Sequence, residues 1–65
     1  MNESYTIELL AGMDGLWGYR IIRTHVIDKE TRITDTIHFE QSEYHNKGEA
    51  LDAAKSWMYF DHNIN

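Results

Sequence analysis

The glycines of one short stretch are the first residues whose spacing suggests chemistry. Residues 11–20 read AGMDGLWGYR, with Gly12, Gly15 and Gly18 three residues apart. A phosphate-binding fingerprint requires Gly-x-Gly-x-x-Gly between a strand and a helix, or a P-loop with its lysine. This stretch has neither, and strand-like sequence lies on both sides of it. We therefore expect a hairpin loop with Gly12 and Gly15 at positive φ, and a bulge or a close approach of another group at Gly18.

The histidines do not form a ligand pattern. His25, His38, His45 and His62 are never spaced two or four residues apart, so we expect surface histidines and no metal site. His25 and Asp35 face each other in one possible strand pairing, but no nucleophile is placed to complete a catalytic triad. A chain of 65 residues also has little room for a substrate pocket. We predict that the protein is not an enzyme and has no catalytic residue, cofactor or metal.

A basic stretch with interleaved aromatics is the strongest functional signal. Aromatic side chains beside arginines stack on bases or anchor a protein interface. The alternative is structural, with the aromatics in the core and the arginines paired across the sheet with acids, for which Glu8, Asp35 and Glu40 are candidates. Both interpretations remain open for the residues of this stretch, which are Trp17, Tyr19, Arg20, Arg23, Lys29 and Arg32.

Size and charge limit the classes of function. The chain has 65 residues, 42% of them hydrophobic and 26% charged, which is typical of one globular domain over residues 1–65. Its net charge is −5, and only residues 20–32 have a basic excess, so direct DNA binding is disfavoured and a protein partner is expected. No apolar run could span a membrane, and Glu3 stands where a signal peptide has basic residues, so we expect a cytoplasmic protein. A small chain without cysteines often gains stability by self-association, so a homodimer is possible.

The hydrophobic pattern predicts three strands and a helix. Alternation at period two indicates strands over 4–10, 16–27 and 32–40, with a polar turn at 28–31. Asn46 followed by Glu49 resembles a capping box, and an apolar stripe then predicts a helix over 47–60, with 61–65 as a frayed end. We therefore predict the α+β class: a three-stranded antiparallel meander with one C-terminal helix packed on one face.

The pairing of the second and third strands is ambiguous. If Asp28 pairs with Thr31, Trp17 and Tyr19 lie on the open face of the sheet, and if Asp28 pairs with Arg32 they lie under the helix. In the second case they join Ile33, Ile37 and Phe39, the alternating apolar residues of the third strand. A bulge near Ile21 and Ile22 is a third possibility. We favour the second register or the bulge, because both bury the large aromatics.

Residues 16–58 resemble a known DNA-binding unit. The stretch WGYRIIRTHVIDKETRITDTIHF followed by YHNKGEALDAAKSW is similar to the three-stranded sheet and helix of arm-type DNA-binding domains at the N-termini of tyrosine integrases. The resemblance implies that the sheet face carrying Arg20, Arg23 and Arg32 enters the DNA major groove. The sequence departs from that pattern in its acidic balance.

A second resemblance is one of size and charge. Small, acidic, cysteine-free domains are similar to the anti-CRISPR inhibitors of phages and mobile elements, and the resemblance implies blocking of a basic nucleic-acid-binding surface. Acids of the second half of the chain would present a phosphate-like row to such a surface: Glu40, Glu43, Glu49, Asp52 and Asp61. We predict a protein-binding module of this kind, with the arm-type DNA-binding domain and an antitoxin-like domain as alternatives. The partner-binding residues we expect are Glu40, Glu43, Glu49, Asp52, Trp17, Tyr19, Arg20 and Arg23.

Overall fold

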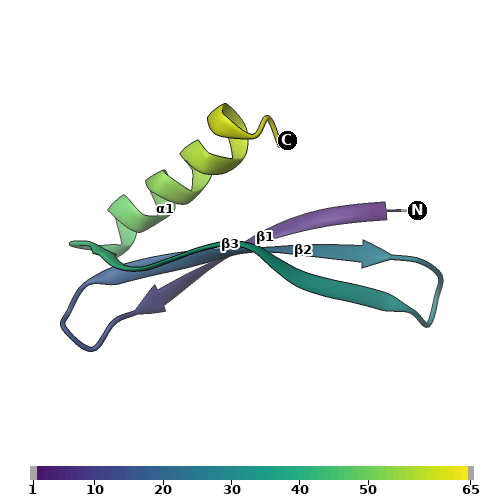
Figure 1. Ribbon diagram of the computed structural model, residues 1–65, viewed down its shortest axis with the longest axis horizontal. Helices are drawn as coiled ribbons and strands as arrows, with labels where there is room; N and C mark the ends of the chain where they lie inside the picture. The colour runs from purple at the N-terminus through teal and green to yellow at the C-terminus, as the bar shows by residue number, and fades with distance from the viewer. Residues whose placement is uncertain (1, 65) are drawn as a thin grey trace.

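The computed structural model describes residues 2–64, in which a helix lies on one face of a three-stranded antiparallel sheet (Figure 1). The strands are β1 (Asn2–Ala11), β2 (Trp17–Val26) and β3 (Arg32–Tyr44), in the sheet order β1-β2-β3. The chain continues as α1 (Lys47–Ser56) and a π-helical turn, η1 (Trp57–Asp61). The predicted α+β class and the meander are therefore confirmed.

The loop between β1 and β2 is a tight hairpin connection. The amide of Gly12 donates to the carbonyl oxygen of Leu16 at 2.8 Å, and Asp14 Oδ1 accepts the Leu16 amide at 3.1 Å. Gly15 has φ of 83°, as the sequence predicted. The same prediction was wrong for Gly12, whose φ is not positive. Space favours glycine at this position, because a Cβ there would lie 2.8 Å from the backbone oxygen of Leu16 and 2.5 Å from the hydroxyl oxygen of Ser42.

The turn between β2 and β3 is held by one carboxylate. Asp28 Oδ1 accepts the amides of Glu30 and Thr31, both at 2.9 Å. Hydrogen bonds of this kind stabilise the charged form, and they lower the pKa of Asp28 below its ordinary value. The two strands therefore leave the turn in a defined pairing, in which Val26 lies opposite Arg32.

A bulge then shifts that pairing in the middle of the sheet. Ile22 lies opposite Thr36, whereas Ile21 lies opposite His38, so Ile37 is an extra residue on β3. The bulge alternative is thus confirmed in position, although the extra residue belongs to β3 rather than to β2. The register with Asp28 opposite Arg32 is wrong, because Arg32 lies opposite Val26. The pairing of the other register is present only from Tyr19 to Ile21. Alternation along β2 is unbroken.

The bulge separates apolar residues of β3 that were expected to share a face. Tyr19 is buried under the helix, and residues directly opposite each other in a ladder share a face. Phe39 pairs with Arg20, the residue after Tyr19, and therefore points away from the helix. Ile33 and Ile37 stay on the helix side, where Ile37 packs against the core. The expectation that Phe39 lies under the helix was wrong, because the extra residue reverses the alternation beyond it.

A second irregularity lies at Gly18. Tyr19 pairs with Glu40 but Trp17 pairs with Tyr44, so three residues of β3 oppose one residue of β2. A Cβ at Gly18 would collide with the backbone of Glu40. The sequence-based expectation of a bulge and a close approach at this glycine is confirmed.

The start of α1 is capped as expected. Asn46 Oδ1 accepts the Glu49 amide at 2.9 Å, and Glu49 Oε1 accepts the His45 amide at 3.0 Å. The first bond satisfies one of the backbone donors that a helix start leaves free, and the second connects the residue before the cap to the first turn. Ala50 and Ala54, on the predicted apolar stripe, are fully buried.

The helix ends differently from the prediction. Regular α-helix stops at Ser56, and the wider turn η1 carries the chain to Asp61. The His62 amide then donates to Trp57 O at 3.1 Å, and the Ile64 amide donates to Met58 O at 2.7 Å. Ile64 packs against the core. Residues 61–64 are therefore folded back on the helix rather than frayed, and Asn65 lies outside the described residues.

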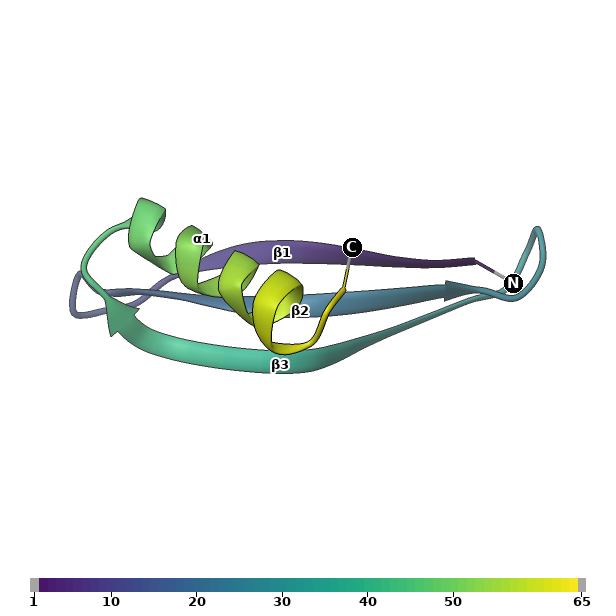
Figure 2. The same ribbon diagram turned by 90° about the horizontal axis from the view of Figure 1, so that it is seen from above.

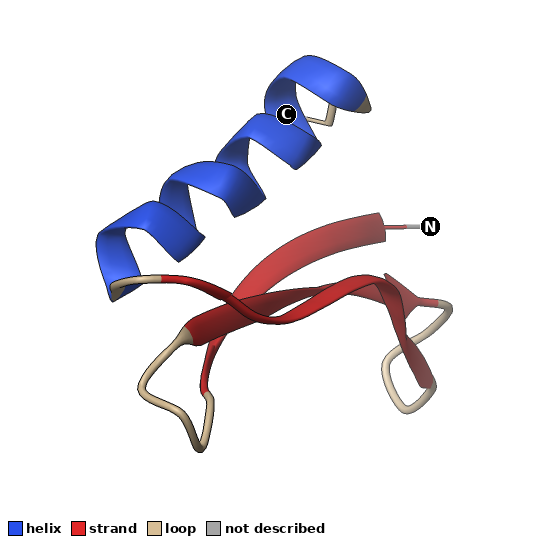
Figure 3. Cartoon of the chain, turned by 60° about the vertical axis from the view of Figure 1, so that its left-hand side comes forward, coloured by secondary structure: helices blue, strands red, loops and turns tan. Residues whose placement is uncertain are grey.

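The core is small and lies at one end of the sheet. Its buried cluster consists of Tyr19, Ile21, Ala54 and Met58. Figure 2 shows that the β2–β3 turn extends beyond the end of the helix. Figure 3 shows the helix on one face of the sheet, with the opposite face uncovered by any drawn element of residues 2–64. The sheet thus presents two surfaces: an open face, opposite the helix, and an overhang, the part of the helix side beyond the core.

Candidate functional site

The open face has a charged and aromatic row at its centre. Arg20 on β2 lies between Glu8 on β1 and Phe39 on β3. Its Nε atom lies 2.5 Å from Glu8 Oε1, and the two side chains are 39% and 44% exposed. Phe39 is 51% exposed. Arginine and aromatic side chains are the residue types most enriched at energetically important positions of interfaces.

The rest of this face is built mainly from β-branched side chains, with Ser4 opposite Thr24 and Arg32 opposite Val26. Ile22 lies between Thr6 and Thr36, one on each outer strand, and Thr24 lies opposite Thr34. These residue types favour strands and leave a surface of mixed polarity. Such a surface suits contact with another protein better than enclosure of a small molecule, which requires a concave site.

Tyr19 and Glu40 lie under the helix instead. The Tyr19 hydroxyl donates to Glu40 Oε2 at 2.5 Å, and the Tyr44 hydroxyl donates to Glu40 Oε1 at 3.3 Å. His38 Nε2 lies 3.3 Å from Glu40 Oε2. Glu40 is thus occupied by three side chains, and its carboxylate is removed from the expected acidic row.

Burial and hydrogen bonding shift the pKa values in this network in opposite directions. Burial raises the pKa of the Tyr19 phenol, and the bond to Glu40 raises it further. The pKa of the Tyr44 phenol is raised for the same reasons. The bond from Tyr19 lowers the pKa of Glu40, since it stabilises the carboxylate. The network therefore holds one ionised carboxylate between two neutral phenols.

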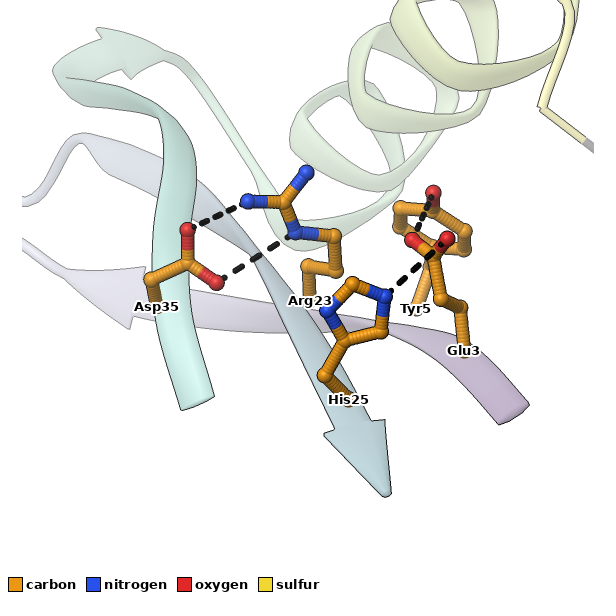
Figure 4. Close-up of polar contacts among 5 residues, drawn as sticks. All are labelled: Glu3, Tyr5, Arg23, His25 and Asp35. Carbon is orange, nitrogen blue, oxygen red and sulfur yellow. Dashed lines mark hydrogen bonds and ion pairs between the residues drawn. The ribbon is translucent and has the colours of Figure 1, made fainter. Parts of the chain in front are cut away.

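The overhang carries a polar cluster on three strands. Arg23 contacts Asp35 through two nitrogen–oxygen pairs, Nη2 to Oδ2 at 2.8 Å and Nε to Oδ1 at 3.4 Å. Glu3 Oε2 accepts a hydrogen bond from the Tyr5 hydroxyl at 3.2 Å, and Glu3 Oε1 lies 3.2 Å from His25 Nε2. Figure 4 shows Arg23 and His25 projecting from β2, with Asp35 on one side and Glu3 and Tyr5 on the other. Asp35 is thus satisfied by a neighbouring arginine, which is one of the partners that the sequence suggested.

Trp17 is half-buried at the end of β2, where Lys47 Nζ lies 5.1 Å from its ring centroid. The contact is a cation–π interaction between the sheet and the start of α1. Trp17 therefore helps to attach the helix, and it lies on the same side of the sheet as Tyr19 rather than beside Arg20. Of the four residues Trp17, Tyr19, Arg20 and Arg23, the open face contains Arg20 alone.

An aromatic stack at the end of the helix was not foreseen. The Trp57 ring lies between His38, with centroids 4.5 Å apart, and His62, with centroids 3.7 Å apart. The stack joins β3, η1 and the chain after η1. The alternation of His38 and Glu40 along β3 could have placed those two residues together, but no sequence pattern placed His62 against Trp57.

The remaining acids of the expected row are exposed. Glu43 is the last of the three bulge residues of β3 opposite Gly18, and Asp52 is exposed on α1. Glu49 is exposed too, although its carboxylate caps the helix through the His45 amide. The row is thus reduced to a smaller acidic surface around the start of α1.

Comparison with protein families, curated proteins and solved structures found no match. Across residues 2–64 there is no detectable pocket and no group of three or more metal-ligating side chains. No helix in that part of the chain combines the length and apolar character needed to cross a membrane. The proposal below consequently rests on the two surfaces of the sheet and on the distribution of charge.

Proposed function

We propose that this chain is a non-enzymatic protein-binding module whose partner presents a basic surface. The observation that carries the proposal is the position of the two central arginines. Arg20 and Arg23 lie on opposite faces of the sheet, and each contacts a carboxylate of a neighbouring strand, Glu8 and Asp35 respectively. Their charges are largely compensated, so the net charge of −5 dominates the attraction at long range.

This arrangement favours a protein partner over DNA. A sheet that enters the major groove needs basic side chains on one face, free to contact phosphates and base edges. Here Arg32 shares the open face with Arg20, but Arg23 lies on the other face. Arg20 and Arg23 would also each have to leave an acid. The arm-type DNA-binding domain is therefore the less supported alternative.

In the proposed binding mode the acidic side chains attract the partner, and the open face makes the close contact with it. The acidic surface around Glu43 and Asp52 accelerates the encounter with a basic surface, and the exposed row with Arg20 and Phe39 makes the close contact. The most concrete form of this function is an inhibitor of the anti-CRISPR type, which covers a nucleic-acid-binding surface of a host complex.

The first experiment is a gel-shift titration of the native protein with a short DNA duplex at low salt. We expect no complex with DNA. Tight binding that weakens steeply with salt would overturn the proposal and favour the DNA-binding alternative, because release of counterions is characteristic of phosphate contacts.

The second experiment measures target-DNA binding by a panel of purified CRISPR effector complexes with the protein added. Where the native protein inhibits, Asp52→Lys should slow association and Phe39→Ala should speed dissociation. Glu30→Lys, at the opposite end of the molecule, is the matched control with the same change of charge. Equal effects of Asp52→Lys and Glu30→Lys would contradict a localised acidic contact.

A further inference from the structure

The two edges of the sheet are unequal. β3 forms one edge and has two irregularities, the extra residue Ile37 and the bulge opposite Gly18, where Ser42 has φ of 55°. β1 forms the other edge and pairs with β2 without interruption from Asn2, opposite Val26, to Ala11, opposite Trp17. Bulges, prolines and lysines are the usual protection of an edge strand against pairing with another strand. β3 has bulges, whereas β1 has a regular ladder, no proline and no lysine.

The loop hydrogen bond establishes which backbone groups of β1 point outward. Gly12 and Leu16 form the next pair of the ladder after Ala11 and Trp17. In this pair the Gly12 amide donates to Leu16 O. Bonded and non-bonded pairs alternate along an antiparallel ladder. The even-numbered residues of β1 therefore bond to β2, and the odd-numbered ones direct their amides and carbonyls to the free edge. These are Glu3, Tyr5, Ile7, Leu9 and Ala11.

We propose that β1 pairs antiparallel with β1 of a second copy of this chain, with Thr6 opposite Thr6 on the two-fold axis. In this register Tyr5 bonds with Ile7 of the second copy, and Glu3 bonds with Leu9 of the second copy. Nine residues overlap and about eight backbone hydrogen bonds form. The result is a six-stranded sheet with both helices on one side.

The charges of β1 favour this register over the one with Ile7 on the axis. A shift that places Ile7 on the axis brings the two Glu8 side chains onto one diagonal, about 7–8 Å apart on the same face. With Thr6 on the axis, Glu8 lies opposite Ser4 of the second copy, whose hydroxyl can donate to the carboxylate. Neither Glu3 nor Glu8 then lies opposite another acid.

The size of the open face supports the same arrangement. Three strands of about ten residues give a face of roughly 400 Å², whereas a standard interface takes about 800 Å² from each partner. Pairing through β1 joins two open faces into one of about that size, with two rows of Glu8, Arg20 and Phe39. This last step rests on the proposed function, whereas the experiments below use no partner and so fail or succeed independently of it.

A substitution at Thr6 on the β1 edge has a matched control at Thr36 on the β3 edge. Thr6 and Thr36 are both exposed, both lie on the open face, and both lie next to Ile22, but they belong to opposite edges. Sedimentation equilibrium of the native protein should show a reversible dimer between micromolar and submillimolar concentrations. Thr6→Lys should weaken this dimer roughly tenfold or more, since it sets two ammonium groups opposite each other, and Thr36→Lys should leave it unchanged.

A disulfide reports the pairing directly, because the chain has no cysteine of its own. Residues at a non-hydrogen-bonded position of an antiparallel pair have Cα atoms about 4.5 Å apart, which a disulfide can bridge. Thr6→Cys should form a covalent dimer on mild oxidation much faster than Thr36→Cys. Amide exchange gives a readout without mutation: the amides of Tyr5, Ile7 and Leu9 should gain protection as the concentration rises.

Three results would overturn the proposal. One is a native protein that stays monomeric at about 0.5 mM, well above the range in which weak specific pairs assemble. Another is equal weakening by the two lysine variants, which would indicate a dimer through the open face. The third is equal rates of covalent dimer formation by the two cysteine variants.

Discussion

Replacement of Tyr19 by phenylalanine tests the network under the helix most directly. The change removes the hydroxyl that donates to Glu40 at 2.5 Å and keeps the ring, which is 1% exposed in the core. A hydrogen bond to a charged group contributes about 1.5–3 kcal/mol. A chain of 65 residues has roughly 3–10 kcal/mol of stability in total, so the loss would be a large share.

The same change should alter the dependence of stability on pH. The pKa of Glu40 is lower in the folded chain than its ordinary value of 4.5, and the Tyr19 bond is the main cause. The associated stability is therefore fully present above that ordinary value and is lost as the pH falls through the lower, folded value. We expect native and variant proteins to differ most near neutral pH and to converge in acid.

Urea denaturation from about pH 7 to about pH 3 measures both effects. Tyr44→Phe is the comparison, because its hydroxyl lies 3.3 Å from the same carboxylate and should contribute less. A Tyr19→Phe deficit that is the same at every pH would refute the reasoning. So would a larger loss from Tyr44→Phe than from Tyr19→Phe.

Three further outcomes follow from other contacts. Gly18→Ala should cost about 2 kcal/mol, because its Cβ would collide with the backbone of Glu40, and thermal denaturation measures the loss; an unchanged melting temperature would contradict the close approach. Asn46→Ala should cost about 1 kcal/mol through loss of the bond to the Glu49 amide, with Asn46→Asp as a control that retains an acceptor. The raised pKa of Tyr19 predicts stability that is complete below its ordinary value of 10.0 and is lost as the pH rises above it. Absorbance titration of the phenols, compared with Tyr19→Phe, should show one group that ionises only as the chain unfolds.

Local patterns were sufficient for the elements and their order. Alternation in residues 4–10 reflects a strand with one covered face, and alternation in 32–40 indicated a strand although the bulge at Ile37 changes its faces. Asn46 with Glu49 marks the helix start, because both side chains bond to backbone amides. The loop glycines were also informative, although for Gly12 the physical reason was space rather than backbone conformation. These features depend on residues close together in the chain, which is why one sequence suffices to predict them.

The composition of each face could not be derived in the same way. The bulge at Ile37 depends on how β3 fits against β2 and the helix, and no glycine or proline marks it. Without it, Phe39 is assigned to the core. The partial burial of Glu40 could not be foreseen either. One of its partners, Tyr19, comes from β2, and the other, Tyr44, comes from β3 beyond the next bulge. The side chains of the proposed interaction surface are therefore determined by the pairing of the strands, which one sequence does not specify.

The extra residue Ile37 also has a consequence for how the sequence of β3 can change in length. Before it, side chains at odd-numbered positions such as Ile33 and Asp35 face the helix side, and after it the even-numbered positions such as His38 and Glu40 do so. Deletion of Ile37 would remove the bulge and restore one uninterrupted alternation, with Phe39 still opposite Arg20 on the open face and no strand added or removed. In diverging copies of this gene, loss of one residue at this point would therefore leave both faces of β3 unchanged, so we expect length differences in β3 to concentrate at the bulge.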